Sequence, residues 1–349
     1  MTELSPTKQG IKIDSCSDMK YFIKRTSCPI CGSSSYEQKC SIPYSSVELS
    51  KYIYEFYSNQ GSFDFNKLMK ACFVAAQCND CLGVFQLNIP NEIFTAEIYE
   101  KWLDPIKTYN LFETKKPVGY YVDYLQGVFR LLTSVGKLPS DIQVFDFGMG
   151  WGSWLMLCKG LGCKVFGSEL CEARKKHAVG LGIQVLEYSQ ISQHKFDLIN
   201  IDQVLEHVAN PYEILIHLKG ALAPNGIMRI AVPNGNGIER LLAVMDWTAD
   251  KSSPNTLNAI APLEHINCFT PKALRKLVDR AGLTVFNLPN YPRMEILHSP
   301  TMEPRLFASI NNRVKERMRP IYRKIIPSKA VERDSLSTDI VVKLGRPRF

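Results

Sequence analysis

Residues 144–153 have the sequence VFDFGMGWGS, in which a short run of β-branched and aromatic residues is followed by three glycines at alternate positions. The run predicts a buried strand, and the apolar segment from Ser153 to Leu161 predicts a helix. Alternating glycines allow a sharp turn whose backbone lies against a ligand where a Cβ would collide. The stretch therefore predicts a strand, a turn and a helix, with a ligand at the carboxyl end of the strand.

The same alternation of short apolar runs and amphipathic segments continues to the end of the chain. The seven runs are 144–147, 164–168, 183–186, 196–201, 227–232, 283–288 and 339–344. Strands that alternate with helices are typical of βαβ units and a parallel sheet. We therefore predict an α/β fold with a doubly wound, seven-stranded, mostly parallel sheet.

The glycine spacing limits the class of ligand. A dinucleotide loop has the pattern Gly-x-Gly-x-x-Gly, whereas this loop is Gly-x-Gly-x-Gly and follows the acidic Asp146, and it lacks the Lys-Ser/Thr of a phosphate loop. Glu169 lies at the end of the second strand, about 20 residues after the loop, where an acid accepts the hydroxyls of a ribose. The alternative for Glu169 is an ordinary surface glutamate.

Two cysteine pairs precede this region. The pairs Cys28/Cys31 and Cys78/Cys81 have the spacing of zinc knuckles, and four thiolates fill the tetrahedral shell of a structural zinc. Cys40 and Cys72 are possible substitutes in that shell. The alternatives are two unrelated reduced pairs or a redox Cys-x-x-Cys. The other cysteines considered lie in apolar surroundings and are expected to fill the core: Cys158, Cys163, Cys171 and Cys268.

The 349 residues suggest two domains, and no apolar run is long enough to span a membrane. The first ten residues lack the pattern of a secretion signal, so we expect a cytoplasmic protein. Residues 305–324 hold seven basic residues and one acid, a net +6 of the chain's +8. One interpretation of this segment is a solvated helix. The other is a helix that lies on an anionic surface, and such a helix would hold the protein at the inner membrane face or gather phosphate-bearing acceptors.

Residues 141–345 resemble class I S-adenosylmethionine-dependent methyltransferases, in the branch similar to ubiquinone-biosynthesis O-methyltransferases and to methyltransferases of bacterial sugar and polysaccharide pathways. The segments that carry the resemblance are 146–152, Glu169, 196–208 with its Leu-Glu-His-Val, 224–233, 264–267 and 269–271. The cysteine knuckles with 81–85 resemble a zinc-bearing extension found on some of these enzymes. Residues 186–190 offer no equivalent of the acid that the family often places near the adenine.

The cysteine pairs and the change of apolar pattern along the chain predict a division into three parts. These are a zinc-binding N-terminal domain at 1–92 with a helix or hairpin around 52–69, a helical linker at 93–140 with helices at 93–111 and 119–132, and a methyltransferase domain at 141–349. The last part carries an insertion at 234–263, which we expect to act as a lid or specificity element, and the basic helical insertion at 300–327.

The resemblance also implies the site residues. S-adenosylmethionine is the expected cofactor, and its binding residues are Asp146, Phe147, Gly148, Gly150, Gly152, Glu169, Asp202 and Gln203. A hydroxyl acceptor needs a base, for which His207 and His265 are candidates, with Glu264 beside the second. Either histidine could instead be a positioning residue. No role is assigned to His177, His194, His217 or His298.

The predicted function is methyl transfer to a small-molecule acceptor, with a sugar or polysaccharide intermediate favoured by the resemblance alone. The alternative is an RNA methyltransferase that binds RNA through its zinc domain, since a basic chain suits RNA. Against this, residues 202–205 are Asp-Gln-Val-Leu, where amino-group methylation of bases usually needs Asn/Asp-Pro-Pro-aromatic, and a Pro-Cys nucleophile is absent. A further alternative is a binding module without catalysis. The sequence leaves open O-, N- or C-methylation and the oligomeric state.

Overall fold

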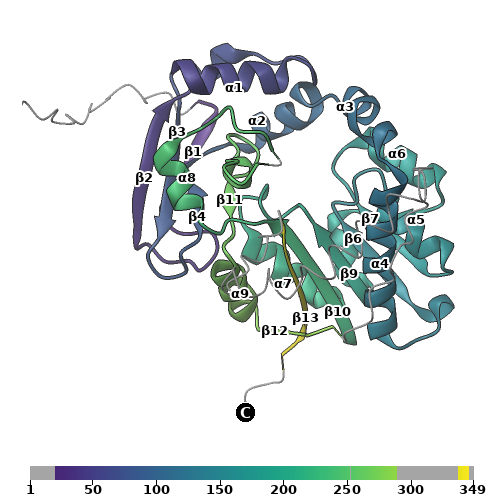
Figure 1. Cartoon of the computed structure of the whole chain (residues 1–349). Coiled ribbons are helices and arrows are strands. Elements are labelled where there is room, and N and C mark those ends of the chain that lie inside the picture. The colour runs from purple at the N-terminus through teal and green to yellow at the C-terminus, as the bar shows by residue number, and fades with distance from the viewer. Residues whose placement is uncertain (1–19, 252, 289–336, 346–349) are drawn as a thin grey trace, which may run out of the picture.

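The computed structural model describes residues 20–251, 253–288 and 337–345 (Figure 1). The basic insertion at 300–327, its segment 305–324 and His298 lie outside these residues, so the expectations for them remain predictions. In the described part, no helix is both long and apolar enough to cross a membrane.

A seven-stranded sheet forms the centre of the C-terminal half, in the order β12-β13-β10-β9-β6-β7-β8 (Figure 1). The strands are β6 (Gln143–Phe147), β7 (Lys164–Ser168), β8 (Gln184–Val185), β9 (Phe196–Asp202), β10 (Leu222–Pro233), β12 (Leu283–Val285) and β13 (Ser337–Leu344). All pairs are parallel except the two that β13 makes with β10 and β12. The predicted mostly parallel sheet is therefore confirmed, and β8 and β12 are shorter than the sequence pattern indicated.

Helices cover both faces of this sheet. The helices are α4 (Val118–Val135), α5 (Ser153–Gly160), α6 (Glu172–Gly180), α7 (Pro211–Ala221) and α9 (Pro271–Arg280). One core packs Val144 and Leu198 of the sheet with α4 and α5, and a second core packs Phe145 and Ile199 with α7 and α9. Neighbouring residues of one strand thus face opposite cores, as expected for a sheet buried on both sides. The doubly wound arrangement is confirmed.

The N-terminal region builds its own sheet. The elements of this region are β1 (Phe22–Lys24), β2 (Tyr36–Pro43), α1 (Val47–Tyr57), β3 (Cys72–Cys78), β4 (Val84–Gln86) and β5 (Asn88–Pro90). Strands β1 and β5 pair with each other in a separate two-stranded sheet. Strand β11 (Asn267–Cys268), from the C-terminal half, pairs with β4 and completes the order β11-β4-β3-β2. The helix of the N-terminal region is amphipathic and buries Leu49, Ile53 and Tyr57. The two halves of the chain therefore share one sheet.

The insertion at 234–263 packs against this sheet. It holds α8 (Ile238–Val244) and a 3₁₀ turn at Asn258–Ile260. Trp247 contacts Phe73 and Tyr52, with ring centroids 5.4 and 5.5 Å apart respectively. These contacts place the insertion in the same core as α1 and β3. Its expected role as a specificity element stays a prediction.

Between the two sheets the chain runs through α2 (Glu92–Glu97), a π-helical turn at Ile98–Trp102 and α3 (Pro105–Phe112), as the upper arc of Figure 1 shows. The segment 93–111 is helical as predicted, but it is broken at Leu103 and Asp104, because Pro105 lacks the N–H that would continue the helix. The helix restarts there, and the Asp104 side chain accepts a hydrogen bond from the Lys107 backbone N–H at 2.7 Å. The predicted helix at 119–132 is confirmed as α4, which ends at Gly136 in the left-handed conformation.

Candidate functional site

The glycine loop after β6 forms the tight turn that the sequence predicted. Gly148, Gly150 and Gly152 have φ of 73°, 55° and 78°, values that L-residues rarely adopt. A Cβ on Gly148 would lie 2.6 Å from Val204 Cγ2, and one on Gly152 would lie 2.6 Å from Ile183 Cδ1. A Cβ on Gly150 would meet nothing within 4 Å. The first and third glycines therefore serve packing, while the second faces open space.

That space is a cavity of about 400 Å³ beside the carboxyl ends of β6 and β9. Five of the predicted cofactor residues line it: Asp146, Gly148, Gly150, Asp202 and Gln203. The other three predicted residues lie next to it, outside the lining. Phe147 is directed toward Tyr188, Gly152 is the packing glycine described above, and Glu169 is held by backbone groups.

Glu169 lies at the tip of β7 and its carboxylate is already hydrogen-bonded. One oxygen accepts from the Gly150 N–H at 3.0 Å, and the other accepts from the N–H groups of Leu170 and Cys171 at 2.9 and 3.1 Å. The acid therefore fixes the glycine loop to the second strand. Its predicted contact with a ribose stays a prediction.

A buried polar network supports the floor of the cavity. Asn200 donates to Asp146 at 2.8 Å, and Arg229 donates to Asn200 and Asp202 at 2.8 and 2.9 Å. Burial raises the pKa of Asp146 to about 8, and the hydrogen bond from Asn200 opposes this rise. Tyr124 also donates to Asp202, at 3.3 Å. Asn200, Tyr124 and Arg229 were missing from the sequence prediction, because the pairing of β9 with β6 and β10 brings Asn200 and Arg229 beside Asp146, and the packing of α4 on the sheet brings Tyr124 to Asp202.

The linker supplies one wall of the same cavity, which the sequence did not predict. The added lining residues from α3, the following turn and α4 are Thr108, Phe112, Glu113, Lys116, Tyr120 and Tyr124. Lys116 Nζ lies 4.4 Å from the Tyr120 ring centroid, and Tyr120 stacks on Tyr124 at 4.7 Å. Tyr120 and Tyr124, at i and i+4, lie on one face of α4, and that spacing was the signal available, whereas Lys116 precedes the helix in extended backbone.

The predicted catalytic residues meet at a second place, between the segment that follows β9 and the segment that leads into β11 of the N-terminal sheet. His207 Nδ1 lies 3.0 Å from the Glu264 carbonyl oxygen and 2.8 Å from the Tyr99 hydroxyl. His265 Nδ1 contacts the Asn258 carbonyl oxygen, and the two imidazole centroids lie 4.7 Å apart. The Glu264 carboxylate accepts a hydrogen bond from the Tyr57 hydroxyl at 2.8 Å. The structure thus brings all three predicted residues together.

Burial sets the protonation of these groups. It lowers the pKa of His207 to about 3, aided by His265, and lowers the pKa of His265 to about 4. Burial raises the pKa of Glu264, against the hydrogen bond from Tyr57. Because a carbonyl oxygen can only accept, each imidazole carries its proton on Nδ1 and keeps a lone pair on Nε2. Both histidines are therefore neutral bases at pH 7.

Glu206 joins this cluster although the sequence analysis did not assign it a role. It is fully buried, and among the described residues neither carboxylate oxygen has a hydrogen-bond partner. Burial raises its pKa to about 8. Gln203 lines the cofactor cavity, and Glu206 and His207 follow it by three and four residues. The two sites are therefore neighbours.

The four knuckle cysteines converge as predicted. Their sulfurs all lie within 4.8 Å of one another, with Cys28 and Cys81 3.6 Å apart and Cys31 and Cys78 3.4 Å apart. Hydrogen bonding from Cys81 lowers the pKa of Cys28 to about 6, which favours a thiolate. Cys40 and Cys72, the possible substitutes, lie outside the cluster. This donor set fits a tetrahedral zinc with no position open to water.

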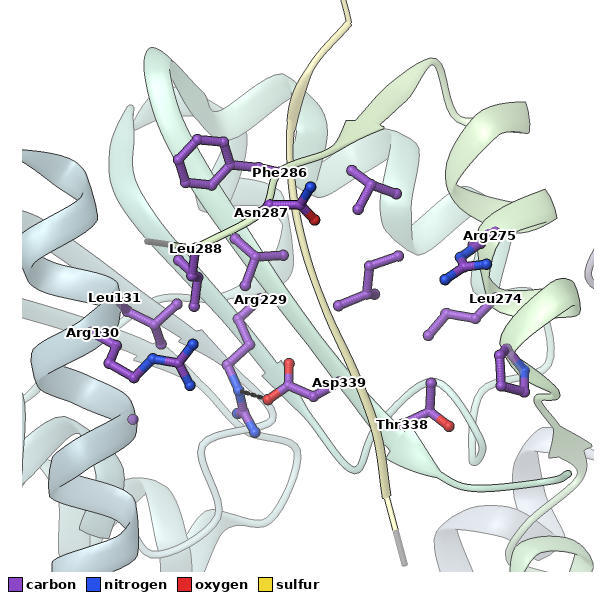
Figure 2. A pocket seen from close by; sticks show the side chains of 15 residues that line it. Arg130, Leu131, Arg229, Leu274, Arg275, Phe286, Asn287, Leu288, Thr338 and Asp339 are labelled. Atoms are coloured by element: carbon purple, nitrogen blue, oxygen red, sulfur yellow. Dashed lines mark hydrogen bonds and ion pairs between the residues drawn. The ribbon is translucent and has the colours of Figure 1, made fainter. Parts of the chain in front are cut away.

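A further cavity of about 390 Å³ lies on the side of the sheet between α4 and α9 (Figure 2). Arg229 and Asp339 form an ion pair at 2.9 Å in its wall. Arg229 thus reaches from this cavity to Asp202 in the cofactor cavity. The described chain ends at Leu288 and resumes at Ser337 beside the same cavity.

Comparison with known proteins agrees with this geometry. Residues 121–288 match a family model described as a methyltransferase domain. The ubiquinone biosynthesis O-methyltransferase of Dinoroseobacter shibae is 25% identical over 201 residues, which cover 52% of this chain and 77% of the relative. The enzyme of the same name from Maricaulis maris is 27% identical over 168 residues, which cover 44% of this chain and 65% of the relative.

Solved structures were also compared. The plantazolicin methyltransferase BpumL in complex with SAH aligns with a TM-score of 0.43 at 17% identity, covering 72% of this chain and 94% of the other. A SAM-dependent methyltransferase from Archaeoglobus fulgidus aligns with a TM-score of 0.34 at 17% identity, covering 61% and 91% respectively. The sheet order, the glycine loop and the matched family model together show that this chain contains a class I S-adenosylmethionine-dependent methyltransferase domain, distantly similar to the ubiquinone O-methyltransferases.

Proposed function

We propose that the protein methylates a small-molecule acceptor, a sugar or polysaccharide intermediate, that binds against His207, His265 and Glu264. The observation that carries this proposal is the cluster of two neutral imidazoles and a carboxylate beside the cofactor cavity. The relatives that the chain resembles are named as O-methyltransferases of a small molecule. A polar, buried cluster of this kind suits an acceptor with hydroxyl groups.

S-adenosylmethionine would supply an electrophilic methyl group from its place against the glycine loop. We assign its binding to Asp146, Phe147, Gly148, Gly150, Gly152, Glu169, Asp202 and Gln203. His265 would accept the acceptor's proton at Nε2, since its Nδ1 is held by the Asn258 carbonyl. Tyr57 and Glu264 would orient the acceptor's other hydroxyls. Alignment of this kind contributes about 7–11 kcal/mol in favourable cases.

A methyl-transfer screen against nucleotide sugars, phenols and RNA, with product masses recorded, tests the acceptor class. We expect a product from one of the small-molecule pools, and His265→Gln should lower its rate by about 10² to 10⁴. His217→Gln is the matched control, because His217 contacts the Tyr188 carbonyl at 3.0 Å and is assigned no role in the site. Methylation of RNA alone would contradict the proposal.

The RNA alternative receives no support from the knuckles. Arg280 of α9 donates to the Ile30 carbonyl at 3.2 Å. A Cβ on Gly83 would lie 3.2 Å from the Ala273 Cβ of the same helix. The knuckles thus pack against the catalytic half of their own chain.

We propose that the four cysteines bind one structural zinc ion, whose closed thiolate shell serves folding.

We further propose that residues 305–324, outside the described part, hold the protein near an anionic surface. Each basic residue near such a surface contributes about 1 kcal/mol. Wild-type protein should co-sediment with anionic but not neutral vesicles at low salt, and changing Arg313, Lys315, Arg317 and Arg319 together to Gln should abolish this. Equal pelleting of the two proteins would contradict it.

A further inference from the structure

Three potential metal ligands from two segments meet beside the cofactor cavity. Glu206 and His207 follow β9, and His265 precedes β11. One nitrogen of each histidine and one carboxylate oxygen of Glu206 all lie within 4.8 Å of one another. His207 Nε2 and Glu206 Oε1 lie 3.7 Å apart. Ligands bound at about 2.1 Å around one ion lie roughly 3–3.5 Å apart, so a side-chain shift of about 1 Å would close the set.

The outer contacts of both imidazoles match those of metal-bound histidines. A ligating histidine usually donates its other ring N–H to a carbonyl or carboxylate, which fixes the tautomer and the ring. Both Nδ1 atoms here contact backbone carbonyl oxygens, those of Glu264 and Asn258. The lone pairs on Nε2 are therefore available for an ion.

Glu206 provides the independent observation. Its side chain is fully buried, yet neither oxygen has a partner in the part of the chain that the structure describes. A buried carboxylate without a hydrogen bond or counter-charge is costly. Its backbone carbonyl, by contrast, accepts from the Asn267 N–H at 3.0 Å, so the segment is firmly placed. A bound cation would satisfy the orphaned oxygens.

We propose that Glu206, His207 and His265 form a divalent metal site with two histidines and one carboxylate. Imidazole ligands favour a transition ion such as Zn²⁺, Fe²⁺ or Co²⁺ over Mg²⁺ or Ca²⁺. Three protein ligands leave positions open, unlike the closed cysteine cluster. The site is thus a second metal centre, separate from the four thiolates.

The open positions give the ion a role that rests on the proposed function. An acceptor hydroxyl that coordinates the ion loses its proton to solvent more readily, because the cation stabilises the resulting oxyanion. His265 then acts as a ligand, and the ion performs the activation that the imidazole would otherwise provide. An acceptor with two adjacent oxygens would fill two open positions and be fixed toward the cofactor cavity.

Binding of Co²⁺ to chelator-treated full-length protein, reloaded with one equivalent of Zn²⁺, tests the site without an acceptor. Cobalt among nitrogen and oxygen ligands gives weak visible bands, whereas cobalt in the cysteine cluster gives intense thiolate charge-transfer bands. We expect one further Co²⁺ per chain with the weak bands. Glu206→Gln should weaken its binding at least tenfold, because loss of even an outer contact costs tenfold or more.

Controls separate metal binding from folding. Glu172→Gln removes an exposed acid of α6 and should bind Co²⁺ like wild type. S-adenosylmethionine binding, measured in parallel, shows whether Glu206→Gln is folded, and His265→Gln offers a second variant. Absence of the weak bands in the wild type, or their persistence in a folded Glu206→Gln, would overturn the metal site. Chelator-treated protein that retains full methyl transfer would refute the ion's role and leave the proposed function standing.

Discussion

Two glycines of one loop share a backbone conformation but differ in what surrounds them. Gly148 and Gly150 both have positive φ, so alanine at either position carries a similar strain of roughly 1–2 kcal/mol. Gly148→Ala should lower the melting temperature further, because its Cβ would lie 2.6 Å from Val204 Cγ2. Gly150→Ala should mainly weaken S-adenosylmethionine binding, since its Cβ enters the cavity. Thermal unfolding and calorimetry would compare them, and equal effects on both measurements would contradict this division.

Asp146 makes stability depend on pH. Its folded pKa of about 8 exceeds the unfolded value, so the folded state keeps a proton that the unfolded chain releases above about pH 4. The contribution is full below the unfolded pKa and is lost as pH rises through 8, by about 1.4 kcal/mol per unit in that window. Asp146→Asn keeps an oxygen that can accept from Asn200 and should flatten this slope. Urea unfolding between pH 5 and 8 checks it, and parallel curves for the two proteins would be the contrary result.

The residues that the sequence predicted were those whose role depends on local spacing. Gly148 and Gly150 follow a strand directly, and the turn requires their type. Arg229 was missed because its importance arises from contacts with Asn200, Asp202 and Asp339 across three neighbouring strands. Glu206 was missed because its meaning comes from lacking a partner within the described fold. Spacing does not encode either property.

At the scale of elements, the two knuckles have the same construction. The fourth residue after the first cysteine of each, Gly32 or Leu82, has a left-handed backbone and donates its N–H to that cysteine's carbonyl. Each turn thereby directs two sulfurs to one side. Cys31 remains half-buried, and burial raises its pKa to about 11 in the absence of an ion.

Metal content tests this cluster. Wild-type protein should contain one zinc in the cysteine cluster, and Cys28→Ser should release it and unfold the N-terminal sheet. The expected loss is large, because structural zinc supplies roughly 10–16 kcal/mol in zinc-finger peptides. Cys40→Ser is the control, since Cys40 lies in β2 outside the cluster. Absence of zinc from wild-type protein prepared without chelator would exclude the zinc.

The spacing of apolar residues predicted most helices and strands, but it did not predict β11 or the break before Pro105. The strands of the large sheet were predictable from their short apolar runs, because strands buried on both faces are continuously apolar. Strand β11 has only two residues, Asn267 and Cys268, and becomes a strand through its pairing with Val84 and Phe85. The break at Pro105 was visible in the sequence but was outweighed by the apolar spacing around it. Local patterns therefore fix long elements better than short ones.

At the scale of the whole molecule, Arg25 joins the two halves of the chain. Its guanidinium donates to the Ile266 carbonyl at 3.0 Å, to the Asn267 side chain at 2.9 Å and to the Ala209 carbonyl at 2.9 Å. Asn267 in turn donates to the carbonyls of Leu205 and Val208 at 2.8 and 2.7 Å. One N-terminal cation thus fixes both segments that carry His207 and His265.

Replacement of Arg25 by methionine tests this connection. Burial lowers the pKa of Arg25 to about 10, so the group is still charged at pH 7 and its hydrogen bonds are charge-assisted. Their loss should cost about 1.5–3 kcal/mol of unfolding free energy. Backbone amides at 203–209 and 264–268 should exchange faster, while those of the glycine loop and S-adenosylmethionine binding stay as in wild type.

The matched control for this change is Lys24→Met. Lys24 is the exposed last residue of β1 and directly precedes Arg25, so its replacement removes a neighbouring charge without touching the catalytic half. Hydrogen exchange of this variant should equal that of wild type at both histidine segments. If Arg25→Met left exchange there unchanged, the N-terminal region would not be what positions His207 and His265. Shared strand pairing through β11 would then carry the connection by itself, because β11 begins two residues after His265.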